Sequence, residues 1–266
     1  MDQEHIRVVP LHVPKPKLAL EDLAKQTGDS ELFDAGKLTA PAGPKLTYRG
    51  GALLQNVEVF TIFWGNNWAN TNSYITLAKN INQFFSDILT SPLIDQLSEY
   101  STAGYTIGHG SLTGTITITD NAPVNSVTDS QLQTALGGWI TGGTVPPVNN
   151  NTLYFIYTDI NVTVQMGGSA SCSSFCGYHN NFGQNTYYAV MPFPGCDGCL
   201  AGQAVLDAVT GTSSHELCEA ITDPVPGQGW YDDTNGEIGD ICAWQFKQVA
   251  GHNVQLEWSN AANACI

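Results

Sequence analysis

Hydrophobic and polar residues alternate with two different periods along most of the chain, and these periods predict an α/β fold. Residues 57–64 alternate and are rich in β-branched and aromatic side chains, which is typical of a buried strand. Apolar residues then recur at helical spacing over 70–90. Pro92 suits the first turn of a short continuation that reaches Tyr100. A strand followed by a long helix is a typical opening of an α/β domain.

The rest of the chain continues this mixture. The further predicted elements are strands at 105–108 and 114–119, as a hairpin or as neighbours, a helix at 129–140 capped by Thr128 or Asp129, a central strand at 153–158, a loop at 161–186, a strand near the sheet edge at 187–191, a helix at 203–222 and a strand at 254–258. Gly211 weakens the last helix, which kinks or restarts there in this interpretation. Pro224 ends it, because Asp223 before proline disfavours the helical conformation.

Candidate chemistry is concentrated in the last two turns of that helix. His215 and Glu219 are spaced i and i+4, so a helix places them on one face, with Glu216 about 100° round the axis. The zinc-peptidase motif H-E-x-x-H has two histidine ligands and a glutamate that acts on metal-bound water. This chain has H-E-x-x-E, in which Glu219 replaces the second histidine.

A structural interpretation of the same residues is a capping box. Ser213-x-x-Glu216 fits one, with Ser213 capping a new helix and Glu216 reaching back to the N–H of the cap residue. Converging carboxylates further along the chain favour the metal interpretation, because a cap does not require them.

Two downstream acids are candidates for a third metal ligand. Asp240 is preferred over Glu237, and the other acid would then orient His215 from behind. Two carboxylates and one imidazole suit one zinc ion best, with manganese, iron or calcium less favoured. The acidic turn around Asp232 and Asp233 is also a candidate calcium site, or simply a solvated turn.

Three residues are candidate catalytic groups. Glu216 would take the proton from a metal-bound water that attacks a peptide carbonyl. His179 and Tyr231 would steady the oxyanion, although each also has a structural interpretation, as a loop-packing residue and as a core aromatic. His109 and His252 have no partner that the sequence identifies, so we treat them as structural.

Seven cysteines complete the candidate chemistry. Cys172-x3-Cys176 and Cys196-x2-Cys199 favour local disulfides over a structural zinc site, because they lie among Ser, Gly and Asn. Cys242 and Cys265 would close the C-terminal segment, which leaves Cys218 as a buried free thiol. Disulfides imply an oxidising compartment, so we expect a secreted protein whose leader is absent from this sequence.

The charge composition limits the classes of partner that the protein is expected to bind. The 266 residues carry 24 acidic and 9 basic side chains, for a net charge of −15, which disfavours nucleic acid and anionic membranes. No apolar run approaches the ~18 residues of a membrane helix. The first 49 residues are neutral overall, so the whole net charge lies after them. We expect a monomer that acts on a peptide or protein substrate.

The N-terminal 45 residues differ from the rest. Five prolines interrupt any regular element, so residues 1–45 are predicted to form an extended arm or pro-segment, and 46–266 the metal-binding domain. An inhibitory pro-segment lying across the cleft is one version of this prediction.

Six short motifs in register support a family resemblance. They are Tyr48-Arg49-Gly50-Gly51, Phe63-Trp64-Gly65-Asn66, Cys176-Gly177-Tyr178-His179, His215-Glu216-Leu217-x-Glu219, Glu237-Ile238-x-Asp240-x-Cys242 and Trp258 with Cys265. From about Tyr48 to Ile266 the chain resembles the EXORDIUM-like, phosphate-induced proteins of plants and their microbial relatives. Cys218 and the turn at 232–236 depart from that pattern.

The resemblance implies a secreted, disulfide-containing protein with a zincin-like central motif. Together with the helix chemistry it predicts a zincin-like α/β (α+β) fold, a mixed twisted sheet with a long helix and an active-site helix. The predicted function is a zinc-dependent metallopeptidase that uses Glu216. The alternative is a non-catalytic EXORDIUM-like binding or signalling protein with a structural metal ion.

Overall fold

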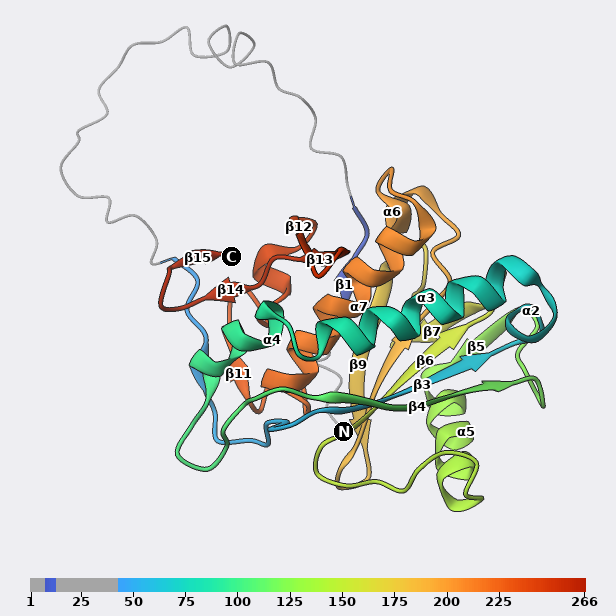
Figure 1. The fold of residues 1–266 in the computed structure, drawn as a ribbon, viewed down its shortest axis with the longest axis horizontal. Coiled ribbons are helices and arrows are strands. Elements are labelled where there is room, and N and C mark those ends of the chain that lie inside the picture. The colour runs from blue at the N-terminus through green and yellow to red at the C-terminus, as the bar shows by residue number, and fades with distance from the viewer. Residues whose placement is uncertain (1–7, 13–42) are drawn as a thin grey trace, which may run out of the picture. The chain divides into compact units, whose positions relative to one another are not determined.

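The computed structural model describes residues 8–12 and 43–266, and it shows a mixed α/β fold built on one six-stranded sheet (Figure 1). The strand order is β1-β9-β10-β6-β3-β4. Strands β10, β6, β3 and β4 run parallel to one another, and β9 is antiparallel to β10. The bounds are β1 Val9–Pro10, β3 Glu58–Trp64, β4 Ser111–Ile118, β6 Thr152–Thr158, β9 Phe175–Phe182 and β10 Thr186–Met191.

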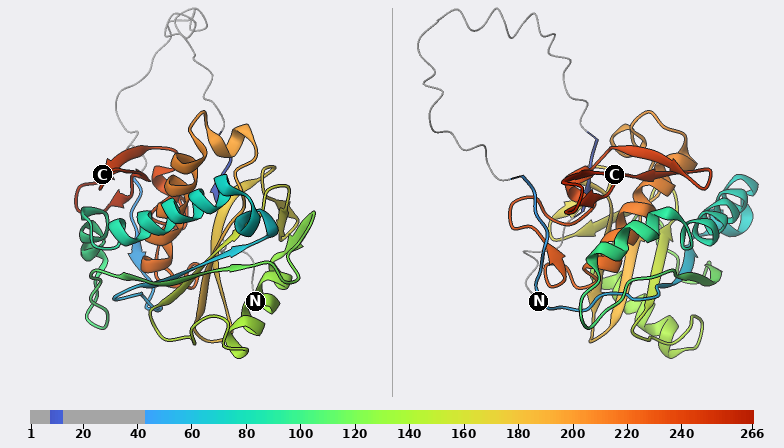
Figure 2. Two further views of the ribbon diagram at one scale, coloured as in Figure 1. Left: turned by 45° about the vertical axis from the view of Figure 1, so that its right-hand side comes forward. Right: turned by 60° about the vertical axis from the view of Figure 1, so that its left-hand side comes forward.

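Helices cover one face of this sheet. Apolar residues at helical spacing in α3 (Asn72–Ile88) bury Ile81, Phe84 and Phe85 against alternate residues of β3 and β6. The helix α7 (Val205–Thr222) lies beside α3 over β9 and β10 (Figure 2). The large core on this side is therefore closed by α3 and α7 together.

The opposite face carries a smaller layer. It consists of α5 (Asp129–Thr141) and a three-stranded sheet of β5 (Ser126–Thr128), β7 (Thr163–Met166) and β8 (Ser169–Ala170). Thr128, one of the two predicted cap residues, caps α5 and forms a capping box with Gln131. Leu132 and Leu136 pack on the second core, formed by the other set of alternate strand residues.

Shorter elements close the edges. They are α2 Asn66–Asn70, α4 Pro92–Gln96, α6 Asp197–Leu200, the 3-10 helices Leu97–Tyr100 and Asp240–Cys242, and the strand pairs β2 Thr47–Tyr48 with β11 Trp230–Tyr231, β12 Phe246–Val249 with β13 His252–Gln255, and β14 Trp258–Ser259 with β15 Ala264–Cys265. The β12–β13 hairpin packs on α7. Because the sheet, α3 and this hairpin surround α7, every side chain from Ala208 to Thr222 is buried.

Three sequence predictions about strands are wrong. Residues 105–108 form no strand and no hairpin with β4, which instead pairs in parallel with β3. The predicted loop at 161–186 contains β7, β8 and β9. The strand at 187–191 does not lie near the edge, because β10 is covered by β9 on one side and β6 on the other. Polar residues such as Asn180 and Asn181 hide the strand pattern of β9, since they are held by sheet pairing rather than by apolar contacts.

Helix α7 corrects one prediction and confirms another. It runs without interruption through Gly211, where a Cβ would lie 2.7 Å from a ring carbon of Phe246. The close packing of the β12–β13 hairpin against α7, rather than a kink in the helix, therefore explains why residue 211 is a glycine. The helix ends at the Asp223 cap before Pro224, as predicted.

Most of the predicted N-terminal arm, residues 1–7 and 13–42, lies outside the described residues. Within residues 8–12, Val9 and Pro10 pair antiparallel with Gly177 and Phe175 of β9. Among the described residues, no helix is both long and apolar enough to cross a membrane.

Candidate metal centre

The polar face of α7 supplies the centre of the site. His215, Glu216 and Glu219 are all fully buried in the last turns of this helix. The capping-box interpretation of Ser213 is wrong, because α7 begins at Val205 and Ser213 lies in its interior. The Ser213 hydroxyl instead lies 2.8 Å from the hydroxyl of Tyr157 on β6. Glu216 is therefore free of a capping role and available to the site.

His215, Glu219 and Asp240 form the first group of possible metal ligands. One ligand atom from each lies within 4.8 Å of the others. Nε2 of His215 is 2.9 Å from Oε1 of Glu219, outside hydrogen-bond geometry, so this buried nitrogen has no hydrogen-bond partner. Asp240 begins the short 3-10 helix after the acidic loop, and its N–H donates to Oε1 of Glu219 at 3.1 Å.

The C-terminal hairpin and the acidic loop hold the His215 ring in place. Gln255 Nε2 lies 2.8 Å from Nδ1 of His215 and 2.9 Å from the carbonyl oxygen of Gly239. A Cβ on Gly239 would lie 2.7 Å from the same Nδ1, so the backbone packs directly against the imidazole. Only glycine allows this approach without moving the ring.

His179, Glu216 and Glu219 form a second group with the same convergence. His179 lies on β9, and its Nδ1 is 3.2 Å from Oε2 of Glu216 and 3.5 Å from Oε2 of Glu219. Its Nε2 donates to the carbonyl oxygen of Asp223 at 3.0 Å. The close approach of β9 to α7 depends on Gly177, where a Cβ would lie 2.8 Å from Thr212 and 3.4 Å from Glu216.

Glu237 lies behind this second group rather than with His215. Its Oε1 is 3.5 Å from Nε2 of His179, and neither of its carboxylate oxygens has a hydrogen-bond partner. The neighbouring acid Asp223 also acts on Glu237, and its own carboxylate accepts the backbone N–H groups of Gly227, Gln228 and Gly229. The two third-ligand candidates are therefore placed on different sides of the cluster.

Burial and mutual repulsion shift the acids of this cluster. Burial raises the pKa of Glu216, and it raises the pKa of Glu237 well above its ordinary value, with repulsion from Glu219 adding to it. Burial and Glu219 also raise the pKa of Asp240 to about 7. For Glu219 burial is outweighed by the nearby positive charges of His215 and His179, which lower its pKa to about 2. Glu219 is thus the most strongly anionic ligand of the set.

The same carboxylates act on the histidines. Burial lowers the pKa of His179, but its hydrogen bond to the Glu216 carboxylate and the negative charges of Glu216 and Glu219 outweigh this and raise it to about 10. In His215 the charge of Glu219 likewise outweighs burial, so its pKa is raised well above the ordinary value. Each imidazole is therefore held in an environment that favours a cation, whether a proton or a metal ion.

The remaining predicted residues lie in the loop that leads to Glu237. Tyr231 is buried on β11, with the Arg49 guanidinium 4.5 Å above its ring. Asp232 accepts backbone N–H groups from Lys45, Thr234 and Asn235. Asp233 pairs with Arg49 at 2.5 Å and is exposed. These donors already bind the two acids, and calcium at this turn stays a prediction.

Two further residues of the site, Gln255 and Glu257, were not singled out by the sequence. Gln255 orients His215, and Glu257 is fully buried with no hydrogen-bond partner for either oxygen. The sequence feature that pointed to them is that these two polar residues alternate with apolar residues over 254–258. Burial raises the pKa of Glu257 well above its ordinary value, and Glu219 adds to the rise.

Replacing Glu257 by glutamine is expected to change how stability depends on pH. Because the folded state holds a proton on Glu257 that the unfolded chain releases above pH ~4.5, wild-type stability falls as pH rises through that window. The glutamine variant lacks this proton. The free energy of unfolding of Glu257→Gln minus that of wild type should therefore increase with pH, by up to ~1.4 kcal/mol per unit.

Urea unfolding of both proteins at pH 5 to 8, in one chelator-containing buffer, measures this difference. All other acids titrate in both proteins, so their contribution cancels to first order. Parallel curves over the whole range would contradict a neutral, buried Glu257.

Disulfides hold the strand that carries His179. Cys172 pairs with Cys196 and Cys176 with Cys199, so the predicted local pairing within each close pair is wrong. Both bridges join the segment at the start of β9 to the region of α6. The predicted bridge Cys242–Cys265 is present, and Cys218 is free and buried. The three bridges fit an oxidising environment.

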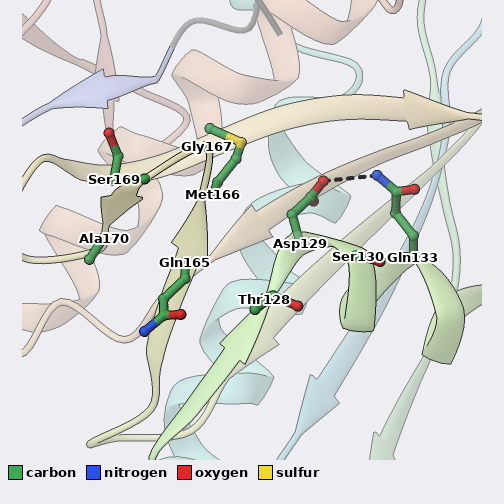
Figure 3. A pocket seen from close by; sticks show the side chains of 10 residues that line it. Thr128, Asp129, Ser130, Gln133, Gln165, Met166, Gly167, Ser169 and Ala170 are labelled. Carbon is green, nitrogen blue, oxygen red and sulfur yellow. Dashed lines mark hydrogen bonds between the residues drawn. The ribbon is translucent and has the colours of Figure 1, made fainter. Parts of the chain in front are cut away.

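A pocket of about 600 Å³ lies elsewhere, between the first turn of α5 and the β7–β8 turn (Figure 3). Asp129 points into it, but its carboxylate already accepts hydrogen bonds from the hydroxyls of Tyr178 and Tyr188 and from Gln133. The buried cluster on α7 has unpaired polar atoms instead, and we therefore place the candidate chemistry there.

Comparison of the chain with models of protein families finds no match, and comparison with curated proteins finds no significant relative. The EXORDIUM-like resemblance therefore stays a prediction based on the six motifs.

Proposed function

We propose that the chain binds a divalent cation, zinc by preference, through His215, Glu219 and Asp240, and acts as a zincin-like metallopeptidase. The observation that carries this proposal is the convergence of one imidazole and two carboxylates, all within 4.8 Å, around a helix with H-E-x-x-E spacing. Zinc sites with three protein ligands leave one position for water or substrate.

The residues present fit such an ion. Nε2 of His215 is buried without a hydrogen-bond partner and faces Oε1 of Glu219 at 2.9 Å, an arrangement that costs free energy unless a cation or proton lies between them. A metal at Nε2 requires the His215 proton on Nδ1. The Gln255 amide would then turn its oxygen toward that proton, giving up the hydrogen bond from its Nε2 to Gly239 and the one from the Trp244 N–H to its oxygen.

The arrangement of the sheet, helix α7 and a downstream acid supports the zincin-like part of the proposal. A zincin needs a sheet, a helix packed under it with two ligands, and a third ligand downstream. Here α7 packs on β9 and β10, and Asp240 follows 21 residues after Glu219. Secretion is proposed on the same footing, from three disulfides that fit an oxidising compartment.

A divalent cation in this position would polarise a water molecule and the carbonyl of a bound peptide. Glu216 supplies the proton acceptor, because its Oε1 has no partner while Oε2 is held by His179. Water oxygen bonds to the peptide carbon, its proton passes to Glu216, and Glu216 returns a proton to the amine as the C–N bond breaks. His179 fixes the orientation of that carboxylate.

Replacing Glu216 by glutamine tests the proposal. The expected result is a loss of ~10²–10⁴-fold in kcat for peptide hydrolysis, because the proton acceptor is removed while the shape is kept. Zinc bound through His215, Glu219 and Asp240 should remain. Activity is measured on a mixed peptide library at acid and neutral pH, with zinc content measured on the same samples.

Glu99→Gln is a matched control, since Glu99 binds Ser259 and Asn260 away from the cluster. It should leave hydrolysis unchanged. Peptide hydrolysis in wild type that survives Glu216→Gln would remove Glu216 from the mechanism, and no hydrolysis in zinc-loaded wild type would overturn the peptidase.

A non-catalytic binding or signalling protein is the second candidate. The observation that favours it is the anionic ligand set, because two carboxylates make a bound metal a weaker Lewis acid than two histidines do. The metal would then be structural. Retained zinc with no hydrolysis of any peptide in the library is the result expected for this candidate.

A further inference from the structure

Glu219 faces two imidazoles with its two oxygens. Oε1 lies 2.9 Å from Nε2 of His215, and Oε2 lies 3.5 Å from Nδ1 of His179. The two histidines come from different elements, α7 and β9, so the carboxylate sits between them. A carboxylate with one oxygen toward each of two ions is a bridging ligand in two-metal sites, where the ions lie ~3.5–4 Å apart.

The hydrogen bonding of His179 prepares its other nitrogen for a metal. Nε2–H donates to the carbonyl oxygen of Asp223, so Nδ1 carries the proton shared with Glu216 when the ring is charged and a lone pair when the ring is neutral. That lone pair is directed at Oε2 of Glu216 and Oε2 of Glu219. Three electron-rich atoms facing one another repel unless a cation lies among them.

An unpaired atom points to the same place. Oε2 of Glu219 is buried without a hydrogen-bond partner, and the side chains of Glu216 and Glu219 are both 0% exposed. Desolvated carboxylates of this kind are found where they coordinate a metal or pair with a cation.

The cluster also contains more carboxyl groups than one divalent ion can neutralise once they are ionised. Its buried or nearly buried acids are Glu216, Glu219, Asp223, Glu237 and Asp240. Among residues 8–12 and 43–266, the ion pair formed by a Lys or Arg side chain is that of Arg49 with Asp233. Asp233 is exposed, and this pair lies outside the cluster. Two divalent ions balance more of this charge than one.

We propose that the centre holds two divalent cations bridged by Glu219, the second bound by Nδ1 of His179, Oε2 of Glu216 and Oε2 of Glu219. This inference deepens the proposed function and rests on the first cation at His215, Glu219 and Asp240. Glu216 keeps its Oε1 as proton acceptor. The ligand class of the second position is the same hard or borderline cation, zinc or manganese, because its donors are two carboxylates and an imidazole.

The stoichiometry of metal binding tests the second position. Purified full-length protein is stripped with chelator, dialysed against zinc, and its metal content measured by elemental analysis. We expect about two ions per chain in wild type and about one in His179→Ala. His252→Ala is the matched control, because its Nε2 also contacts a carboxylate, that of Asp87, at 2.9 Å, outside the cluster. It should keep two ions.

Two further measurements test the second metal position without relying on His179→Ala alone. His179→Gln and Glu216→Gln keep side-chain volume, and each should also reduce the content from about two ions to one if His179→Ala fails to fold. In manganese-loaded wild type, two bridged ions should give an exchange-coupled electron paramagnetic resonance spectrum, which the variants replace by that of a single ion.

The outcomes separate the two proposals. One ion in wild type, unchanged in the His179 and Glu216 variants and lost in His215→Ala, overturns the second position and leaves the first. Two ions that persist in all three variants overturn the assignment of the second position to these ligands. No bound ion in wild type overturns both positions.

Discussion

Replacing His215 by alanine is expected to weaken zinc binding by ~10²–10³-fold. Structural zinc sites with four ligands bind with ~10–16 kcal/mol, so one ligand contributes on the order of 3 kcal/mol. His215 is fully buried and held by Gln255 and Gly239, so the site holds its imidazole in position before the metal arrives. The variant should also lose any hydrolytic activity that depends on that zinc.

The affinity is measured by competition with a chromophoric chelator at neutral pH, on wild type and variant side by side. His109→Ala is the matched control, because His109 is an exposed histidine that contacts Asp95 at 2.8 Å. It should bind zinc as wild type does. Equal zinc affinity in His215→Ala and wild type would move the metal away from α7.

Removing the Cys176–Cys199 bridge is expected to lower the free energy of unfolding by ~2–4 kcal/mol. The bridge closes a loop with a sequence separation of 23 residues, and a cross-link of this length restricts the unfolded chain strongly. It also joins α6 to β9, which carries His179. The double variant Cys176→Ser/Cys199→Ser should therefore show weaker zinc binding as well as lower stability.

Urea unfolding at fixed free zinc measures the stability change. The single variant Cys218→Ser controls for the chemical change alone, because Cys218 is buried and free. We expect its effect to be smaller than that of the double variant. A double variant as stable as Cys218→Ser would show that the remaining Cys172–Cys196 bridge alone holds α6 on β9.

The predicted and observed secondary structure agree where apolar periodicity is strong. The strand at 57–64, the helices at 70–90 and 129–140 and the central strand at 153–158 lie within a few residues of β3, α3, α5 and β6. Each of these elements packs a regular apolar set on one or two cores. Local pattern and tertiary packing therefore favour the same structure in each of them.

The secondary-structure prediction failed where a strand is specified by its pairing with a neighbouring strand rather than by its own residue types. Strand β9 has Asn180 and Asn181 in a segment that resembles a loop, yet it pairs with β10 along its length. The cysteines follow the same rule, because the two close pairs are brought together crosswise when β9 and α6 dock. Spacing along the chain carries no information about such docking.

The sequence by itself determined the mixed α/β class, the helix ending before Pro224 and the spacing that puts His215 and Glu219 on one face of it. These follow from local periodicity and the conformational limits of proline. The tertiary structure decided that Asp240 joins His215 while Glu237 lies behind His179, and that His179 reaches Glu216 and Glu219 from β9. Those contacts depend on how closely β9 approaches α7 at Gly177, a distance set by packing between segments far apart in the chain.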